Sequence, residues 1–164
     1  MNEAHDTAAI RARAQTMACD IMRQMSGIEL SLDPVPHTDD DMAGLDVVYG
    51  HVTGKHPMHL LFCAKIGFFT RMARNMLGED PEDEEEAKDY AMEFFNVLCG
   101  RFVSEIYEVT RNMRILSPPS YLGWSTIAQT ETIENILGTV DKIWLISEEN
   151  ELAVFLWTPV ATQA

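Results

Sequence analysis

The feature that most restricts the fold of this chain is a long helical stretch from Asp83 to Thr110. It contains no proline and one glycine, so no strong helix breaker interrupts it. A projection at about 100° per residue gives an apolar side that is predicted to lie against a core. Its residues are Ala91, Phe94, Phe95, Leu98, Phe102, Ile106 and Val109. The opposite side, predicted to be exposed, carries Asp89, Glu93, Asn96, Gly100, Ser104 and Tyr107.

Two residues on the exposed side are poor helix formers. Glycine in a helix interior costs about 1 kcal/mol relative to alanine, and asparagine costs roughly two-thirds of that. Glu93 and Asn96 are three residues apart and therefore neighbours, and Gly100 follows one turn later. The set is either a solvated face, with Gly100 admitting another element, or a polar, low-relief patch that a partner contacts. The same projection places Cys99 on a flank of the helix.

The remaining elements predict one α+β domain over residues 1–164. Helices are predicted at 7–26 and 65–78, ending near Gly27 and Gly78, because glycine is common at helix C-termini. Alternating or β-branched runs predict strands at 28–33, 45–54, 56–64, 114–120, 142–147 and 152–157. The tract from Trp124 to Pro159 is β-rich as a whole. This order predicts two layers, an antiparallel sheet covered by long helices on one face.

Charge and composition exclude several classes of protein. A net charge of -14 would repel nucleic acid. The apolar runs are too short to span a membrane, and the N-terminus does not resemble a signal peptide. Three separated cysteines indicate reduced thiols, so we expect a cytoplasmic protein. The acidic run at 78–89 is either a solvated helix start or an acidic docking surface.

Other candidate sites are weaker. His51, His56 and His59 have no cysteine or carboxylate at ligand spacing, so no metal site is predicted there. The chain contains no phosphate-binding glycine loop and no nucleophile elbow. A small-molecule sensor that uses aromatic side chains of the sheet is an alternative function. Its pocket would be formed by Trp144, Phe155 and Trp157, which otherwise read as core or dimer-interface residues.

The segment EEEAKDYAMEFFNVLCGRF at 84–102, followed by RILSPPSYLG at 114–123, resembles the CheX branch of the CheC/CheX chemotaxis phosphatases. In that family a long helix with E-x-x-N and a following glycine leads to a strand with a Ser/Thr-Pro-Pro signature. Here that signature is Ser117-Pro118-Pro119-Ser120. Residues 47–78 resemble the family's glycine-containing hairpin and helix, so the resemblance covers residues 5–159, nearly the whole chain.

The resemblance implies a phosphatase of CheY-type receiver domains, with a two-layer CheC/CheX-like fold. By position, Glu93 would pair with the receiver's active-site lysine, and Asn96 would orient the attacking water. Asp89, Gly100 and Ser104 on the same face would contact the receiver. Mg²⁺ would be held by the receiver, so this chain needs no cofactor or metal. The chain has a single E-x-x-N, and one-site members of this kind form homodimers.

A non-catalytic function on the same fold remains the main alternative. Such a protein would bind a receiver domain or another signalling protein, or serve as a scaffold, without hydrolysis. The presence of both Glu93 and Asn96 favours the enzyme, because a pure binder could have lost Asn96 freely.

Overall fold

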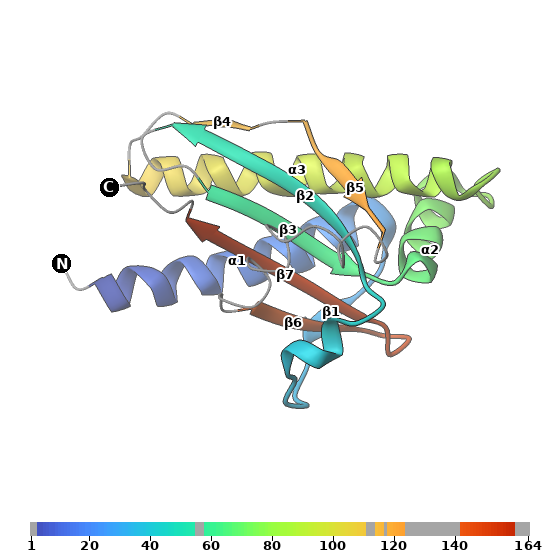
Figure 1. The fold of residues 1–164 in the computed structure, drawn as a ribbon, viewed down its shortest axis with the longest axis horizontal. Coiled ribbons are helices and arrows are strands. Elements are labelled where there is room, and N and C mark those ends of the chain that lie inside the picture. The colour runs from blue at the N-terminus through green and yellow to red at the C-terminus, as the bar shows by residue number, and fades with distance from the viewer. Residues whose placement is uncertain (1–2, 55–57, 111–113, 117, 124–141, 160–164) are drawn as a thin grey trace.

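The computed structural model describes residues 3–54, 58–110, 114–116, 118–123 and 142–159, and shows an α+β fold (Figure 1). The helices are α1 (Glu3–Ser26), α2 (Ile66–Leu77) and α3 (Glu84–Thr110), with a short 3₁₀ helix η1 (Asp39–Met42). The strands are β1 (Leu30–Leu32), β2 (Asp46–Gly54), β3 (Met58–Ala64), β4 (Arg114–Leu116), β5 (Ser120–Leu122), β6 (Lys142–Ser147) and β7 (Leu152–Pro159). The predicted α+β class and the three predicted helices are confirmed. Residues 124–141, the first part of the predicted β-rich tract, lie outside the described residues.

All strand pairs of the described sheet are antiparallel, as predicted. The order is β1-β6-β7-β3-β2-β4, and β5 also pairs with β2. The predicted single strand at 114–120 is instead two short strands, β4 and β5, on either side of Pro118 and Pro119. Proline has no N–H to donate to a strand ladder, which explains the interruption.

Local chemistry accounts for the helix and turn positions. Gly78 ends α2 with φ 80°, a left-handed conformation that glycine adopts without steric cost, and its N–H donates to Arg74 O at 2.8 Å. At the start of α3, Asp83 Oδ1 accepts the Glu86 N–H at 2.9 Å. Part of the acidic run therefore caps a helix. In the β6–β7 turn, Asn150 has φ 62°, a conformation that asparagine tolerates better than most residues.

The helices form one layer behind the sheet (Figure 1). There α1 and α3 run in opposite directions, and α2 lies at the end where α3 begins. The main core fills the space between the layers. It includes Phe62 of β3, Phe94 of α3 and Phe155 of β7, all fully buried. The Phe62 and Phe94 rings meet edge to face with centroids 5.1 Å apart, a favoured geometry for aromatic pairs.

The opposite face of the sheet is also partly covered. A second cluster of buried residues lies there: Met42, Leu45, Val47, Leu61, Cys63, Val154 and Leu156. The segment 33–45, which we call the strap, supplies Met42 and Leu45. The strap is held by His37, whose ring stacks on Trp144 of β6 with centroids 4.7 Å apart. The helices cover one face as predicted, and the strap covers part of the other face.

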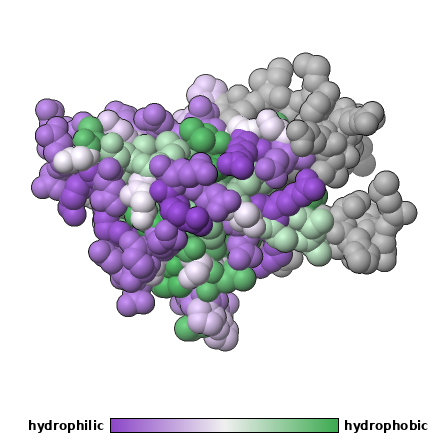
Figure 2. Space-filling view, turned by 180° about the vertical axis from the view of Figure 1, so that it is seen from behind, coloured by the Kyte–Doolittle hydropathy of each residue, from purple (hydrophilic) through white to green (hydrophobic). Residues whose placement is uncertain are grey.

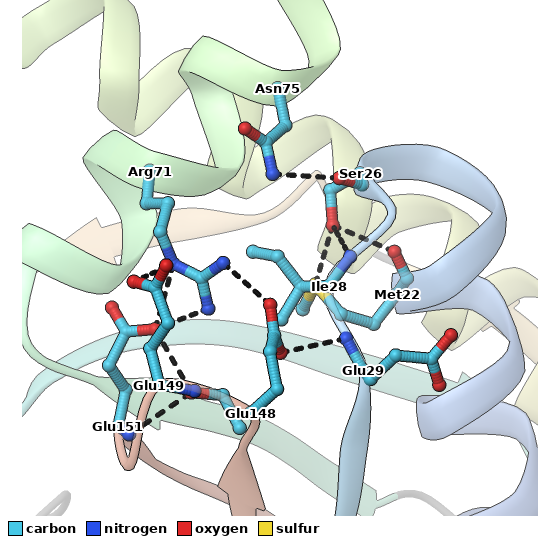
Figure 3. Close-up of polar contacts among 10 residues, drawn as sticks. Met22, Ser26, Ile28, Glu29, Arg71, Asn75, Glu148, Glu149 and Glu151 are labelled. Carbon is cyan, nitrogen blue, oxygen red and sulfur yellow. Dashed lines mark hydrogen bonds and ion pairs between the residues drawn. The ribbon is translucent and has the colours of Figure 1, made fainter.

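One arginine joins the helix layer to the β6–β7 turn (Figure 3). Arg71 of α2 contacts the carboxylates of Glu148, Glu149 and Glu151, and its side chain is only 13% exposed. Nearby, the Asn75 side chain donates to Ser26 O at 2.9 Å, which ties α2 to the end of α1. These contacts fix α2 beside the start of α3.

Candidate functional site

The candidate site lies on the outward face of α3. The five predicted site residues Asp89, Glu93, Asn96, Gly100 and Ser104 are all exposed. On the opposite side of the helix, Ala91, Phe94, Phe95, Leu98 and Phe102 are buried, as the projection predicted. The side chains of Ile106, Tyr107 and Val109 lie outside the described part. The helix therefore presents the five residues in a row along about four turns.

The polar side chains of this row have no partners within the described residues. Asp89, Glu93, Asn96 and Ser104 make no hydrogen bond or ion pair there. Their neighbours do, since Lys88 pairs with Glu85 at 3.1 Å. The view from behind, on the helix side, shows a largely hydrophilic surface with smaller hydrophobic patches (Figure 2). The carboxylate of Glu93 and the amide of Asn96 are therefore available to an outside ligand or partner.

Gly100 does not serve packing within the described residues. A Cβ added at this position would meet nothing within 4 Å. One of the two explanations for this glycine, close packing of another element, is therefore not supported. The glycine therefore leaves the helix backbone uncovered one turn beyond Asn96.

The row rests on a closely packed base. Phe94, Phe95 and Cys99, which lie beside Glu93, Asn96 and Gly100 in the sequence, are buried in the main core. Cys99, which the projection places on a flank of the helix, is fully buried. Burial raises the pKa of the Cys99 thiol, so this group stays neutral and unreactive. A helix held in this way can present Glu93 and Asn96 with little reorganisation.

Two residues beside the row were missed by the sequence analysis. Val97 is 44% exposed, an apolar side chain between Glu93 and Arg101 on the helix surface. The exposed Arg101 lies one residue after Gly100, and its Nε is 3.7 Å from Glu105 Oε1. The sequence could have indicated both residues, because their positions fall on the exposed side of the helical projection. Val97 is apolar and Arg101 lies beyond the E-x-x-N pattern, so neither was named as a site residue.

The histidine cluster is on the other side of the molecule. Tyr49 Oη and His59 Nδ1 are 2.6 Å apart, and the His51 and His59 rings are 5.3 Å apart, on the sheet face away from the helices. Burial, followed by the charge of His51, lowers the pKa of His59, which favours the neutral ring. Among the described residues, no group of three or more histidine, cysteine or acidic side chains is arranged to hold a metal ion. His56 lies outside the described residues.

The aromatic residues of the alternative sensor do not share one pocket. Phe155 is fully buried and Trp157 packs against the main core, whereas Trp144 belongs to the opposite face. A cavity of about 560 Å³ lies between the strap, the start of α2 and the β6–β7 turn. None of the described residues in its wall belongs to α3. No helix in the described part is both long and apolar enough to cross a membrane.

Known proteins resemble this chain in their sequence profile and in their fold. The sequence profile of the family described as "Chemotaxis phosphatase CheX" matches residues 48–136, more than half of the chain. No curated protein sequence matches. The fold is similar to that of CheX from Desulfovibrio desulfuricans, with 14% identity, coverage of 93% of this chain and 99% of that one, and a TM-score of 0.66.

Two further solved structures have the same fold. CheX from Vibrio vulnificus is 16% identical, with coverage of 88% of this chain and 93% of that one, and a TM-score of 0.67. The other is a CheX–CheY–BeF₃–Mg²⁺ complex from Borrelia burgdorferi. It is 14% identical and aligns over 90% of this chain and 96% of that one, with a TM-score of 0.64. At these identities the likeness is evidence for the fold alone.

Proposed function

The chain belongs to the CheX family, and from this premise we propose that it hydrolyses the phosphoryl-aspartate of a CheY-type receiver domain in chemotaxis or two-component signalling. The similar Borrelia burgdorferi CheX was solved in a complex with CheY, BeF₃ and Mg²⁺, which supports a receiver domain as the partner. The observation that carries the proposal here is the unpartnered pair Glu93 and Asn96 on the exposed, rigidly seated face of α3.

Glu93 is the proposed anchor. Its carboxylate would accept a charge-assisted hydrogen bond from the receiver's active-site lysine and so fix the position of α3 over the acyl phosphate. The neighbouring Asp89 and Ser104 would add polar contacts, and the bare backbone at Gly100 would let the receiver approach closely. Positioning of this kind can supply a large share of a rate enhancement, since it removes the entropy cost of bringing reactants together.

Asn96 is the proposed water-orienting residue. An amide has both a donor and an acceptor, so it can hold a water in line with the phosphorus without repelling the phosphoryl oxygens as a carboxylate would. The water oxygen forms a bond to phosphorus while the acyl phosphate P–O bond breaks. The leaving group is a carboxylate, whose low pKa means that it needs no proton at the moment of departure.

Charge neutralisation is assigned to the receiver. Phosphoryl transfer depends on cations near the phosphoryl oxygens, and in this proposal the receiver's Mg²⁺ and lysine supply them. We therefore propose that this chain contributes no metal or other cofactor. We also propose that it acts in the cytoplasm as a homodimer, in keeping with its single E-x-x-N.

The test is the decay of a CheY-type receiver from the same organism, phosphorylated with acetyl phosphate and freed of excess donor. The wild-type chain is expected to accelerate the decay. Asn96→Ala is expected to slow the accelerated rate about 100-fold, because the water is no longer held in line. Asn96→Asp is expected to lose the acceleration as well, although its shape is conserved, because its charge repels the phosphoryl group.

Glu79→Ala is the matched control for Glu93→Ala. Glu79 is an exposed carboxylate that precedes α3 and has no partner within the described residues. Glu93→Ala is expected to weaken receiver binding and Glu79→Ala to leave it unchanged. A decay with wild type that is no faster than that of the receiver alone, with binding intact, would mean that the chain binds the receiver without hydrolysing its phosphate. Equal acceleration by wild type and Asn96→Ala, with α3 folded by circular dichroism, would mean that Asn96 does not orient the water.

A further inference from the structure

A groove of about 240 Å³ lies between α1 and α3, beside the proposed site. Its wall contains Arg13, Thr16 and Asp20 from α1 and Arg101 and Glu105 from α3. Arg101 is five residues beyond Asn96, a rise of about 7.5 Å along the helix. Arg101 also lies one turn beyond exposed Val97, so the groove borders the outward surface of α3 on its α1 side.

The charges in the groove are not balanced pair by pair. Asp20 is bound by Arg23 outside the groove, with Nη2 to Oδ1 at 3.2 Å. Glu105 is 3.7 Å from the Arg101 guanidinium, farther than a normal hydrogen bond. Arg13 is exposed and has no hydrogen bond or ion pair within the described residues. Two guanidinium groups thus retain most of their hydrogen-bonding capacity.

We propose that Arg13 and Arg101 bind a carboxylate-bearing surface segment at the rim of the phosphorylated receiver's active site. The proposal rests on the proposed function and names the contact that orients the receiver on α3. A phosphoryl-aspartate site that holds Mg²⁺ contains carboxylates, since these are the ligands that Mg²⁺ takes from proteins, and the segment proposed here carries carboxylates other than the metal's own ligands. Arginine matches carboxylates with paired N–H donors, which makes it suited to such a rim.

The distribution of charge over the helix layer supports this orientation. The chain carries a net charge of -14, yet in α1 (Glu3–Ser26) three arginines balance three acidic residues, Glu3, Asp6 and Asp20. The beginning of α3 is acidic instead, with Glu84, Glu85 and Glu86 in its first turn. An acidic receiver rim is therefore repelled at the start of α3 and attracted toward the groove. This asymmetry favours one orientation of the receiver over Glu93 and Asn96.

The size of a typical interface allows both contacts at once, since it covers about 800 Å² on each partner. Arg101 is about 7.5 Å from Asn96 along the helix axis, and Arg13 lines the same groove as Arg101. The receiver can thus place its phosphoryl group at Asn96 and its acidic rim against Arg13 and Arg101.

The experiment measures kcat and KM for dephosphorylation of the receiver by wild type, Arg13→Glu and Arg101→Glu. Each substitution is expected to raise KM about fivefold or more, with little change in kcat, because a rim charge affects encounter more than chemistry. The KM ratio of variant to wild type is expected to shrink as salt is raised, because salt screens exposed charges. Arg13→Lys is expected to restore most of the affinity.

Lys65→Glu is the control for the change in net charge. Lys65 is exposed at the start of α2 and has no ion-pair partner in the described part, but it lies in the wall of the other cavity. It is expected to alter KM much less than Arg13→Glu does. If both reversals raise KM equally, the groove has no specific role and the proposal is overturned.

Two further readouts separate the possible failures. Binding of the BeF₃⁻·Mg²⁺-activated receiver to Asn96→Ala, with and without Arg13→Glu, tests the groove independently of hydrolysis. Weaker binding with Arg13→Glu supports the groove even if no phosphatase activity is found, whereas equal binding overturns it while leaving the phosphatase intact. A change of oligomeric state in Arg13→Glu, seen by sedimentation, would assign the groove to contact between copies and also overturn the proposal.

Discussion

At residue 100, the proposed docking role and helix stability favour different side chains. Glycine lowers helix stability, and its Cβ position is open to solvent. We therefore expect Gly100→Ala to raise the free energy of unfolding by about 1 kcal/mol. The added methyl group would also hold the receiver away from the backbone, so receiver dephosphorylation should slow. Urea unfolding and the decay assay, applied to the same preparation, measure the two effects.

A second substitution strengthens this test. Gly100→Gln adds a longer side chain without charge and is expected to slow dephosphorylation further while also stabilising the helix. A stabilised Gly100→Ala protein with unchanged KM and kcat would show that the bare backbone is not used in docking.

At this scale the sequence was most informative about α3 itself. Periodicity placed Glu93 and Asn96 on the exposed face because Phe94, Phe95 and Leu98 mark the buried side. It did not show how far burial extends around the helix, since Cys99 on a flank of the projection is fully buried. In the folded chain α1, α2 and the sheet all contact α3, so the buried arc is wider than the sequence alone indicates.

Among the elements, the strap is the one that sequence patterns described least well. Its Pro, Asp and Gly content is typical of a loop, yet it covers the sheet through Met42 and Leu45. A hint was present in β3, where apolar residues occupy both alternating faces, as expected of a strand covered on both sides. The hairpins and helix ends were predictable because local turn chemistry determines them. The strap was not, because its position depends on distant contacts such as His37 with Trp144.

The contacts of His37 in the strap predict that the free energy of unfolding depends on pH. His37 Nε2 is 2.6 Å from Asp33 Oδ2, and His37 Nδ1 is 3.1 Å from Asp41 Oδ2. Carboxylates only accept hydrogen bonds, so both contacts require a doubly protonated ring. The hydrogen bond to Asp33, followed by that to Asp41, raises the pKa of His37 above its usual 6.5. The stabilisation is therefore complete below about pH 6.5 and lost as pH rises through the raised pKa.

The measurement is the free energy of unfolding of wild type and His37→Gln at pH 5.5 and pH 8.5. We expect the difference between the two proteins to be larger at pH 5.5. Backbone N–H and His37 hydrogen bonds lower the pKa values of Asp33 and Asp41, so their contribution remains at pH 5.5 and falls only well below it. A difference that is equal at the two pH values, or larger at pH 8.5, would contradict an ionised His37 in the strap.

At the scale of the whole molecule, the net charge opposes association between copies of the chain. With -14 charges on each copy, self-association is opposed by repulsion that acts over about 30 Å at 0.01 M salt and about 8 Å at 0.15 M. We therefore expect the proposed homodimer to be weakest at low ionic strength. Sedimentation equilibrium should show a dimer dissociation constant that falls about tenfold or more between these two salt concentrations. At higher salt the constant should change less, because little repulsion remains to be screened.

Sedimentation near pH 4.6, where the sequence predicts no net charge, is a control that removes repulsion without added salt. A chain that stays monomeric under all these conditions, while still accelerating receiver decay, would show that one copy of α3 with its single E-x-x-N is sufficient.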